Sequence, residues 1–364
     1  MINEKLALLG GAPIRTEPYP IHNTIGQEEI DRANAVLKSG SLSGFLARGN
    51  EQFLGGPSVK ELESAFCHYF SVDFAVSMNS ATSALHSALI ALRIGSGDQV
   101  MVPPYTMSAS AATIVQTGAT PIFVDIEPDT FCIDPNLVAG ALNKNVKAIV
   151  AVNLFGMASD LILLRKLCDE NNIALIEDNA QAPAARCKNR FTGTIGDIGV
   201  FSLNRHKTMQ VGEGGVAITN DPGLASRMRL VRNHGEAVIF DTGEFEHSDI
   251  AGYNYRLTEL QASMAVPQLD KLEEFNNYRI DMAGHLSEGI WKFKFLKAPT
   301  LRPNCNHVYY LYPMLYDDKI LKVDRNSFLS ALQAEGIHAS TYIQPVHLLP
   351  LFNKHDQNIG KCPT

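Results

Sequence analysis

The sequence has few cysteines, and none of them form the closely spaced pairs that are typical of zinc sites and redox motifs. It holds six cysteines among 364 residues, without a Cys-x-x-Cys pair. They are Cys67, Cys132, Cys168, Cys187, Cys305 and Cys362. Isolated thiols in apolar surroundings favour reduced side chains over disulfides or a metal site. We therefore predict free thiols, no metal and a cytoplasmic location.

Long apolar runs and positive charge are also scarce. The longest apolar stretch, around 146–155, is interrupted by Lys147 and Asn153, and is far shorter than the roughly 18 residues of a membrane-spanning helix. The first residues, with Glu4 and a very short apolar run, do not resemble a signal peptide. The net charge is −7, from 31 lysines and arginines against 38 aspartates and glutamates. These features argue against membrane or nucleic-acid partners.

Length and composition predict a folded protein of two domains. Domains average roughly 150 residues, and 45% hydrophobic residues in a chain of 364 are ample for a sizeable core. The pattern along the chain suggests an N-terminal arm over 1–25, a large domain over 26–250 and a small domain over 251–364.

Strand and helix signals alternate through the large domain. Short apolar segments precede segments with helical periodicity, and glycine or proline marks many boundaries. The predicted strands span 74–78, 99–102, 121–125, 146–152, 174–177 and 200–202. The predicted helices span 27–40, 60–70, 80–92, 108–117, 135–142 and 161–171. We therefore predict an α/β fold with a mainly parallel central sheet and helices on both faces, whose ligands bind beyond the carboxyl ends of the strands.

The alternation stops after about residue 250, which indicates a smaller α+β domain. Helical patterns extend over 258–275, 278–292 and 325–336, and β-rich patterns over 308–316 and 338–342. Between the first two predicted helices of the chain, the Gly- and Ser-rich segment 42–56 is typical of a loop.

Three clusters that follow strands have the residue types of a reactive site. In the first, Asn79 to Ser83, small residues and hydroxyls begin a helix. Backbone N–H groups at such a start bind anions, although Ser80 is equally suited to be an ordinary N-cap. In the second, Asp178 ends an apolar strand, where a carboxylate needs a partner unless it caps a helix.

The third cluster contributes a lysine. Lys207 lies between a strand and the glycine-rich segment 212–215. It is either a surface lysine or, in a dry pocket, an amine that loses its proton and forms a Schiff base with an aldehyde. An anion cradle, an acid and a lysine in this order are typical of a pyridoxal 5′-phosphate enzyme of fold type I.

Short blocks of sequence around these clusters match a known family in order and spacing along nearly the whole chain. The blocks are 79–85, 104–106, 124–126, 177–182, 196–199, 201–207, 212–215, 233–235 and 253–262. With them the chain resembles the DegT/DnrJ/EryC1/StrS sugar aminotransferases. The resemblance implies the type I pyridoxal phosphate fold and transfer of an amino group from glutamate or glutamine to a nucleotide-linked keto sugar or a ketocyclitol.

The resemblance also implies roles for the reactive side chains. Lys207 would bind pyridoxal 5′-phosphate covalently and shuttle the substrate proton, and Asp178 would keep the pyridine nitrogen protonated. Gln181 would contact the side of the ring that carries the hydroxyl. Tyr342 and His347 lie in the family's C-terminal Tyr-x-x-Pro-x-His region and are candidate substrate residues, although His347 is equally suited to structural packing.

Further residues match the family's phosphate-binding positions. Ser80, Ala81, Thr82 and Ser202 would bind the phosphate of the cofactor in their own subunit. Asn254 matches an asparagine that reaches the phosphate of the neighbouring subunit. The resemblance therefore implies a homodimer with shared active sites.

The chain departs from the family pattern in several places. Met107 occupies a position that is usually aromatic and stacks on the cofactor ring, although a thioether also packs on a ring face. Arg205 stands where proline is common. Family members usually continue from a similar Cys-Pro through another helix, so the resemblance predicts a small domain shortened at Thr364.

The resemblance leaves the substrate open. Segment 6–15 resembles the ketocyclitol branch of aminoglycoside synthesis, whereas basic residues in 42–56 or 204–206 could contact a nucleotide diphosphate. Amino sugar, cell-surface glycan and antibiotic pathways all use such enzymes. Relatives with histidine in place of Lys207 dehydrate sugars, so a dehydratase or lyase is one alternative and a non-catalytic, cofactor-sensing regulator is another.

Overall fold

A seven-stranded sheet forms the centre of the protein. The computed structural model describes residues 5–20, 23–243 and 249–353. The strand order is β1-β9-β8-β5-β4-β2-β3, and β9 runs antiparallel to both of its neighbours while the other adjacent strands are parallel. The strands are β1 (Phe74–Met78), β2 (Gln99–Val102), β3 (Thr120–Phe123), β4 (Val146–Val152), β5 (Ala174–Asp178), β8 (Ile198–Ser202) and β9 (Gly215–Thr219). The predicted mainly parallel α/β sheet is confirmed.

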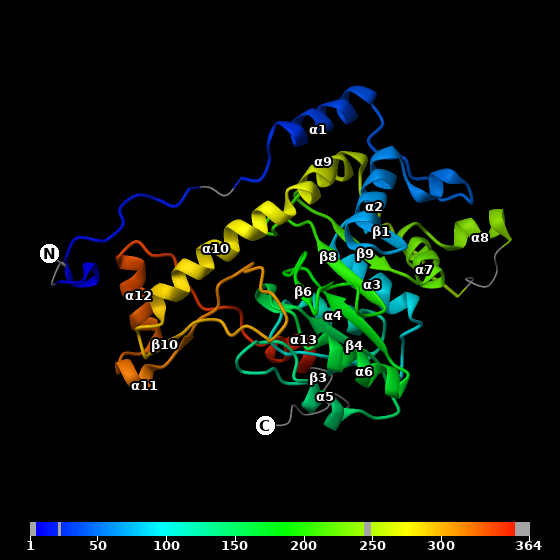
Figure 1. Ribbon diagram of the computed structural model, residues 1–364. Helices are drawn as coiled ribbons and strands as arrows, with labels where there is room; N and C mark the ends of the chain where they lie inside the picture. Colours follow the sequence, from blue (N-terminus) through cyan, green and yellow to red (C-terminus); the bar gives the residue numbers. More distant parts are fainter. Residues whose placement is uncertain (1–4, 21–22, 244–248, 354–364) are drawn as a thin grey trace.

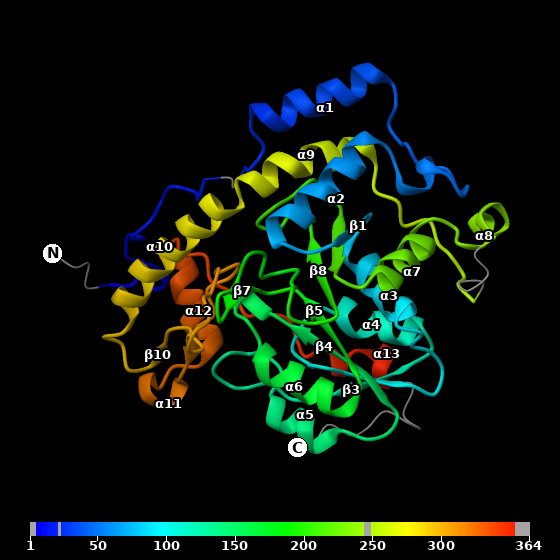
Figure 2. The same ribbon diagram turned by 45° about the vertical axis from the view of Figure 1, so that its right-hand side comes forward.

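Helices cover both faces of this sheet (Figures 1 and 2). One face packs against α3 (Ala81–Ala91), α4 (Ala109–Gln116) and α7 (Pro222–Arg232). The other face packs against α2 (Pro57–Phe70), α5 (Pro135–Ala141), α6 (Leu161–Asn171) and α9 (Glu259–Asp270). Successive side chains of a strand point to opposite faces, so Val76 joins the first core and Ala75 the second. Burial on both faces explains the nearly continuous apolar strands.

The predictions for residues 27–202 agree with the observed elements to within a few residues at most ends. The helix α1 (Gln27–Ser39) ends at Gly40, which has a left-handed backbone with φ of 71°. The sequence analysis missed β9 and α7, because β9 begins at a glycine and follows the glycine-rich turn 212–215.

The C-terminal third corrects several predictions. The predicted break between 275 and 278 is wrong, because α9 ends at Asp270 and α10 (Leu272–Ile290) continues through Asn276, whose side chain donates to the carbonyl of Pro183 at 2.9 Å. The predicted strands over 308–316 and 338–342 reduce to β11 (Leu315–Tyr316), which pairs with β10 (Leu296–Lys297). In the described residues 308–314 and 338–342 form no ladder. Tyr309 has a left-handed backbone, which is incompatible with a continuous strand.

The shorter elements lie around this frame. They are α8 (Glu236–Thr242), α11 (Asp318–Leu321), α12 (Arg325–Ala334), α13 (Pro350–Asn353), β6 (Arg186–Cys187) and β7 (Arg190–Phe191). The long α10 leads from the sheet toward α12, where the N-terminal arm also lies (Figure 1). There the carboxylate of Glu335 accepts hydrogen bonds from the N–H groups of Ala7 and Ile14, at 2.8 and 3.0 Å.

The division of the chain at 250 into two domains stays a prediction, and the predicted end of the small domain at Thr364 lies outside the described residues. No helix in the described ranges is long and apolar enough to cross a membrane.

Candidate active site

The carboxyl edge of the sheet brings together all three clusters that the sequence singles out. In the strand register, Met78 and Ser202 both pair with Gly215, and Asp178 pairs with Val200. Because β1, β5 and β8 run in the same direction, the residues that follow them emerge at one edge. The start of α3, the Asp178 carboxylate and the loop of the lysine are therefore neighbours, although they are far apart in the sequence.

The start of α3 has the features of a phosphate cradle. The Oγ of Ser80 accepts a hydrogen bond of 3.0 Å from the N–H of Ser83 and so caps the helix. Gly215 packs directly against this turn, since a Cβ there would lie 2.4 Å from the backbone nitrogen of Ala81. Within the described part of the chain, the N–H groups of Ala81 and Thr82 have no acceptor. Two free donors at the positive end of a helix suit a phosphate.

Asp178 is a buried carboxylate that hydrogen bonds hold in place. It is 6% exposed, its Oδ2 accepts from the hydroxyl of Ser110 at 2.9 Å, and its Oδ1 accepts from the N–H of Ala180 at 3.1 Å. Burial raises the pKa of Asp178 above its ordinary value, while these two donors and the charge of Lys207 oppose the rise. Asp178 is thus a weaker acid than an aspartate in water, and a further cation in contact with its side chain would favour the ionised form.

Lys207 faces this carboxylate from the loop after β8. Burial lowers the pKa of the Lys207 amine, and the negative charge of Asp178 opposes this effect. The Nζ atom lies 4.7 Å from the ring centroid of Tyr310, a cation–π contact. The amine therefore contacts an aromatic face within range of the Asp178 charge, and it loses its proton more readily than a lysine in water.

The neighbours of Lys207 point elsewhere. Arg205 and His206 are both exposed, and the Nε of Arg205 lies 3.3 Å from the Nε2 of His206. The turn that carries them is closed by a hydrogen bond of 2.8 Å from the N–H of Lys207 to the carbonyl of Asn204. Of these adjacent side chains it is therefore Lys207, and not His206, whose charge interacts with that of Asp178.

Gln181 has both ends of its amide engaged. Its Oε1 accepts from the N–H of Phe155 at 2.7 Å, and its Nε2 donates to the hydroxyl of Tyr342 at 3.0 Å. The ring of Tyr342 packs against Phe155 and Tyr105, at centroid distances of 4.7 and 5.3 Å. Burial raises the pKa of Tyr342 to about 12, so the hydroxyl stays protonated. Residues 161 positions apart thus fix each other at the site.

Ser202 and Asn254 border the phosphate cradle. Ser202 is buried at the end of β8, and its Oγ accepts from the N–H of Asn204 at 3.3 Å. The backbone carbonyl of Asn254 accepts from the side chain of Asn79 at 3.4 Å. The side chain of Asn254 is exposed and accepts from the Nε of Arg256 at 2.8 Å. It is thus open to contact with another molecule.

Met107 and His347 make their contacts with groups other than the carboxylate and the lysine. Met107 is 55% exposed, and its sulfur accepts from the N–H of Ala109 at 3.2 Å. The ring of His347 packs 5.9 Å from that of Phe123, with its Nδ1 buried and without a hydrogen-bond partner. The structure brings neither side chain into hydrogen-bonding contact with Lys207 or Asp178 in the described residues.

The sequence analysis missed three residues that contact the site. Ser110 and Thr106 form a buried hydroxyl pair 3.1 Å apart, which supports the Asp178 carboxylate from α4. Their spacing of four residues at the start of a predicted helix was the available signal. Tyr310, which covers Lys207, had no local signal, because it comes from a segment that only the tertiary fold brings to the lysine. Within the described residues no group of three or more His, Cys, Asp or Glu side chains could hold a metal ion.

Comparison with known proteins gives consistent matches along the chain. A family model described as the DegT/DnrJ/EryC1/StrS aminotransferase family matches residues 23–364. The L-glutamine:2-deoxy-scyllo-inosose aminotransferase of Streptomyces kanamyceticus is 33% identical over an alignment of 366 positions, gaps included, which covers 96% of this chain and 83% of that protein. The GDP-perosamine synthase of Caulobacter vibrioides is 33% identical over 296 residues, 81% of this chain and 78% of that protein.

A solved structure agrees with these relatives. The crystal structure of S. venezuelae DesV in complex with a ketimine intermediate is 33% identical to this chain and superposes with a TM-score of 0.80. The match covers 93% of this chain and 84% of DesV.

Proposed function

This chain belongs to the DegT/DnrJ/EryC1/StrS aminotransferase family, and on that premise we propose that it transfers an amino group from glutamate or glutamine to a keto sugar or a ketocyclitol. The observation that carries the proposal is the pair of Lys207 and the buried Asp178 at the carboxyl edge of the sheet, which lie close enough for their charges to interact. An aminotransferase needs such a pair to move a substrate proton beside a protonated pyridine ring.

The residues at this edge fit pyridoxal 5′-phosphate. The free N–H groups of Ala81 and Thr82, with the hydroxyl of Ser202, would bind the phosphate. Asp178 would face the ring nitrogen, and Lys207 would attach the cofactor through its amine. When bound, the cofactor supplies a carbonyl carbon and an electron-withdrawing ring.

The chain's own residues then perform the proton transfers. Lys207, whose pKa burial lowers, takes up a proton at Nζ and returns it, while Tyr310 holds the amine in place. Asp178 would stabilise a proton on the ring nitrogen of bound cofactor, and the hydrogen bond from Ser110 orients the Asp178 carboxylate and favours its charged form. Gln181, whose side chain donates a hydrogen bond to Tyr342, lines the site from the loop after β5. Burial of these groups limits the access of water, which strengthens their electrostatic interactions.

The substrate class follows from the relatives by analogy. One relative is named for glutamine and 2-deoxy-scyllo-inosose, and another for GDP-perosamine. The first name describes amination of a ketocyclitol and the second describes an amino sugar product, and we infer that this chain aminates a ring ketone. Met107, exposed at the start of α4, is the residue here that would meet the cofactor ring or the acceptor, and His347 and Tyr342 are candidates for contact with the substrate.

We further infer a homodimer that shares its active sites. The exposed side chain of Asn254 beside the start of α3 supports this inference, because it is free to reach a second subunit. Analytical ultracentrifugation tests it directly, and an Asn254→Ala variant should lose affinity for the cofactor without losing its fold.

The absorption spectrum of the purified protein tests the proposed activity. We expect a yellow band from lysine-bound cofactor that bleaches when glutamine or glutamate is added, and amination of a ketocyclitol or nucleotide-linked keto sugar afterwards. A band that persists with both donors would contradict amino transfer and favour the lyase chemistry of related enzymes. Failure to bind the cofactor after reconstitution would contradict the role of Lys207.

A further inference from the structure

Two cysteines from distant parts of the chain meet beside the active-site loops. The Sγ atoms of Cys187, in β6, and Cys305 lie 2.8 Å apart, although 118 positions separate the two residues. Both are free thiols in the structure. The sequence analysis treated them as isolated, because only the packing of residues 302–310 against the β6–β7 hairpin brings them together.

The backbone around this pair has the geometry of a cross-strand disulfide. Cys187 and Cys305 face each other in an isolated antiparallel bridge. The flanking hydrogen bonds run from the N–H of Lys188 to the carbonyl of Asn304, at 2.8 Å, and from the N–H of Asn306 to the carbonyl of Arg186, at 3.0 Å. The cysteines are therefore a non-hydrogen-bonded pair, in which Cα atoms lie about 4.5 Å apart. That separation is within the roughly 4.4–6.8 Å range of disulfides.

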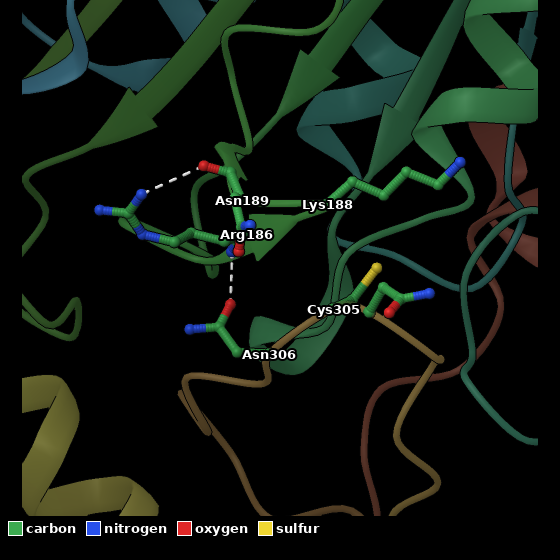
Figure 3. A pocket seen from close by; sticks show the side chains of 6 residues that line it. Arg186, Lys188, Asn189, Cys305 and Asn306 are labelled. Carbon is green, nitrogen blue, oxygen red and sulfur yellow. Dashed lines mark hydrogen bonds between the residues drawn. The ribbon is translucent and has the colours of Figure 1, made fainter.

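A cavity of about 570 Å³ opens onto one of the two sulfurs (Figure 3). Its lining residues are Arg186, Lys188, Asn189, Asn304, Cys305 and Asn306. In Figure 3 the sulfur of Cys305 points toward the turn between β6 and β7 that carries Lys188. Cys305 is partly exposed, whereas Cys187 is 3% exposed and lies behind it. A small molecule in the cavity would thus meet Cys305 first.

The charges around the pair favour an anionic ligand and a reactive thiol. Lys188 makes no ion pair among the described residues, whereas Arg302 is paired with Glu127. The hydrogen bond from Cys305 lowers the pKa of the Cys187 thiol, although burial opposes this effect, and the same bond raises the pKa of Cys305. The Cys187 thiol therefore ionises more readily than the Cys305 thiol that it contacts.

We propose that Cys187 and Cys305 form a redox pair, which closes to a disulfide by exchange with a small anionic disulfide that enters the cavity. Oxidised glutathione, which carries carboxylates, has the required chemistry. The proposal does not rest on the aminotransferase activity.

The exchange proceeds in two balanced steps. Cys187 first releases its proton to water; Cys305 then passes its proton to the Cys187 thiolate and attacks one sulfur of the small disulfide, whose S–S bond breaks. One half leaves as a thiolate that takes a proton from water, and the other half stays bound to Cys305. Cys187 then releases its proton to water and attacks the Cys305 sulfur, and the second half leaves and is protonated. Two protein thiols have lost two electrons and two protons, and the small disulfide has become two thiols.

Closure would tie two segments of the active site together. Cys187 lies on the hairpin that follows the Gln181 loop, and Cys305 lies in the segment that leads to Tyr310, the residue over Lys207. A crosslink that closes so long a loop restricts the unfolded chain. We therefore expect a higher unfolding temperature for the oxidised protein than for the reduced protein.

Peptide mapping of the full-length protein tests the proposal. The reduced protein is freed of reductant, incubated with oxidised glutathione, unfolded, alkylated and digested without reduction. We expect one crosslinked peptide pair that contains Cys187 and Cys305, with the other four of the six cysteines alkylated. Recovery of both cysteines in alkylated form, or a crosslink to a different cysteine, would overturn the proposal.

Single variants test the order of attack. In Cys187→Ser, we expect Cys305 to retain a glutathione adduct, and in Cys305→Ser, we expect Cys187 to stay unmodified because it is buried. The reverse result would overturn the assigned order. Cys168→Ser is the matched control. Cys168 is buried beside the carbonyl of Ala174, and this substitution should leave the crosslink intact.

Lys188→Gln should slow exchange with oxidised glutathione several-fold but not with the cationic disulfide cystamine. Equal slowing of both exchanges would remove Lys188 from the proposal.

Discussion

The hydroxyl of Ser110 donates a hydrogen bond of 2.9 Å to Oδ2 of Asp178 and so joins the start of α4 to the end of β5. Thr106 lies 3.1 Å from the same hydroxyl, and both side chains are 1% exposed. In a buried site this donor decides how readily the carboxylate ionises, because burial raises the pKa of Asp178.

Ser110→Ala should slow amino transfer without preventing cofactor binding. A hydrogen bond to a charged group contributes about 1.5–3 kcal/mol, and about 1.4 kcal/mol corresponds to a ten-fold change in rate. We expect kcat/KM at neutral pH to fall about ten-fold or more and to recover partly as the pH rises, since the pKa of Asp178 would rise further. Thr117→Ala is the control, because the Thr117 hydroxyl donates to Ile114 in the same helix. An unchanged pH profile would exclude this role for Ser110.

Lys207→Ala should abolish both half-reactions and the absorbance of lysine-bound cofactor. The amine at this position is the group that faces Asp178, and no other side chain of the loop replaces it. His206→Ala is a matched control at the adjacent position, where the side chain is exposed, and it should keep nearly full activity. Spectra and single-turnover assays of both variants give the comparison. Measurable transamination by Lys207→Ala would refute the assignment.

Asp178→Asn should stabilise the cofactor-free protein at neutral pH while it removes most of the activity. The pKa of Asp178 is raised in the folded state above its ordinary value of 3.8. The stabilisation by this group is therefore present below pH 3.8 and is lost as the pH rises through the folded pKa. An asparagine avoids that loss, so its advantage in unfolding temperature should appear above the folded pKa and vanish in acid. Thermal unfolding at several pH values measures it, and a variant that is less stable at neutral pH would contradict the prediction.

Gly215→Ala should weaken binding of the cofactor phosphate. The added Cβ would lie 2.4 Å from the nitrogen of Ala81 and 2.5 Å from the carbonyl carbon of Ser80, so the start of α3 must move away from β9. We expect the affinity for pyridoxal 5′-phosphate to fall at least ten-fold, as measured by equilibrium dialysis. Gly140→Ala in α5 meets nothing within 4 Å and should bind the cofactor normally. Equal affinities for both variants would show that the cradle tolerates the shift.

The sequence determined the parts of the fold that depend on local pattern. Apolar segments such as 146–152, buried on both faces, could be recognised as strands, and Gly40 could be recognised as a helix end. The three reactive clusters could also be located, because parallel strands place the residues after them at one edge. Prediction failed where neighbours decide the outcome. Segment 338–342 has β propensity but no partner strand in the described structure, and Asn276 lies inside α10, where its buried side chain donates a hydrogen bond to the carbonyl of Pro183.

Only the tertiary structure decided which distant side chains touch. Tyr310 over Lys207, Tyr342 on Gln181 and Cys305 on Cys187 all join the C-terminal third to loops of the sheet. No periodicity or motif encodes these contacts, because they depend on how α10 and the segment after it pack back against the sheet. The sequence by itself determined the acid, the lysine and the strands that carry them; the packing of remote segments decided their burial, and with it the direction in which their pKa values move.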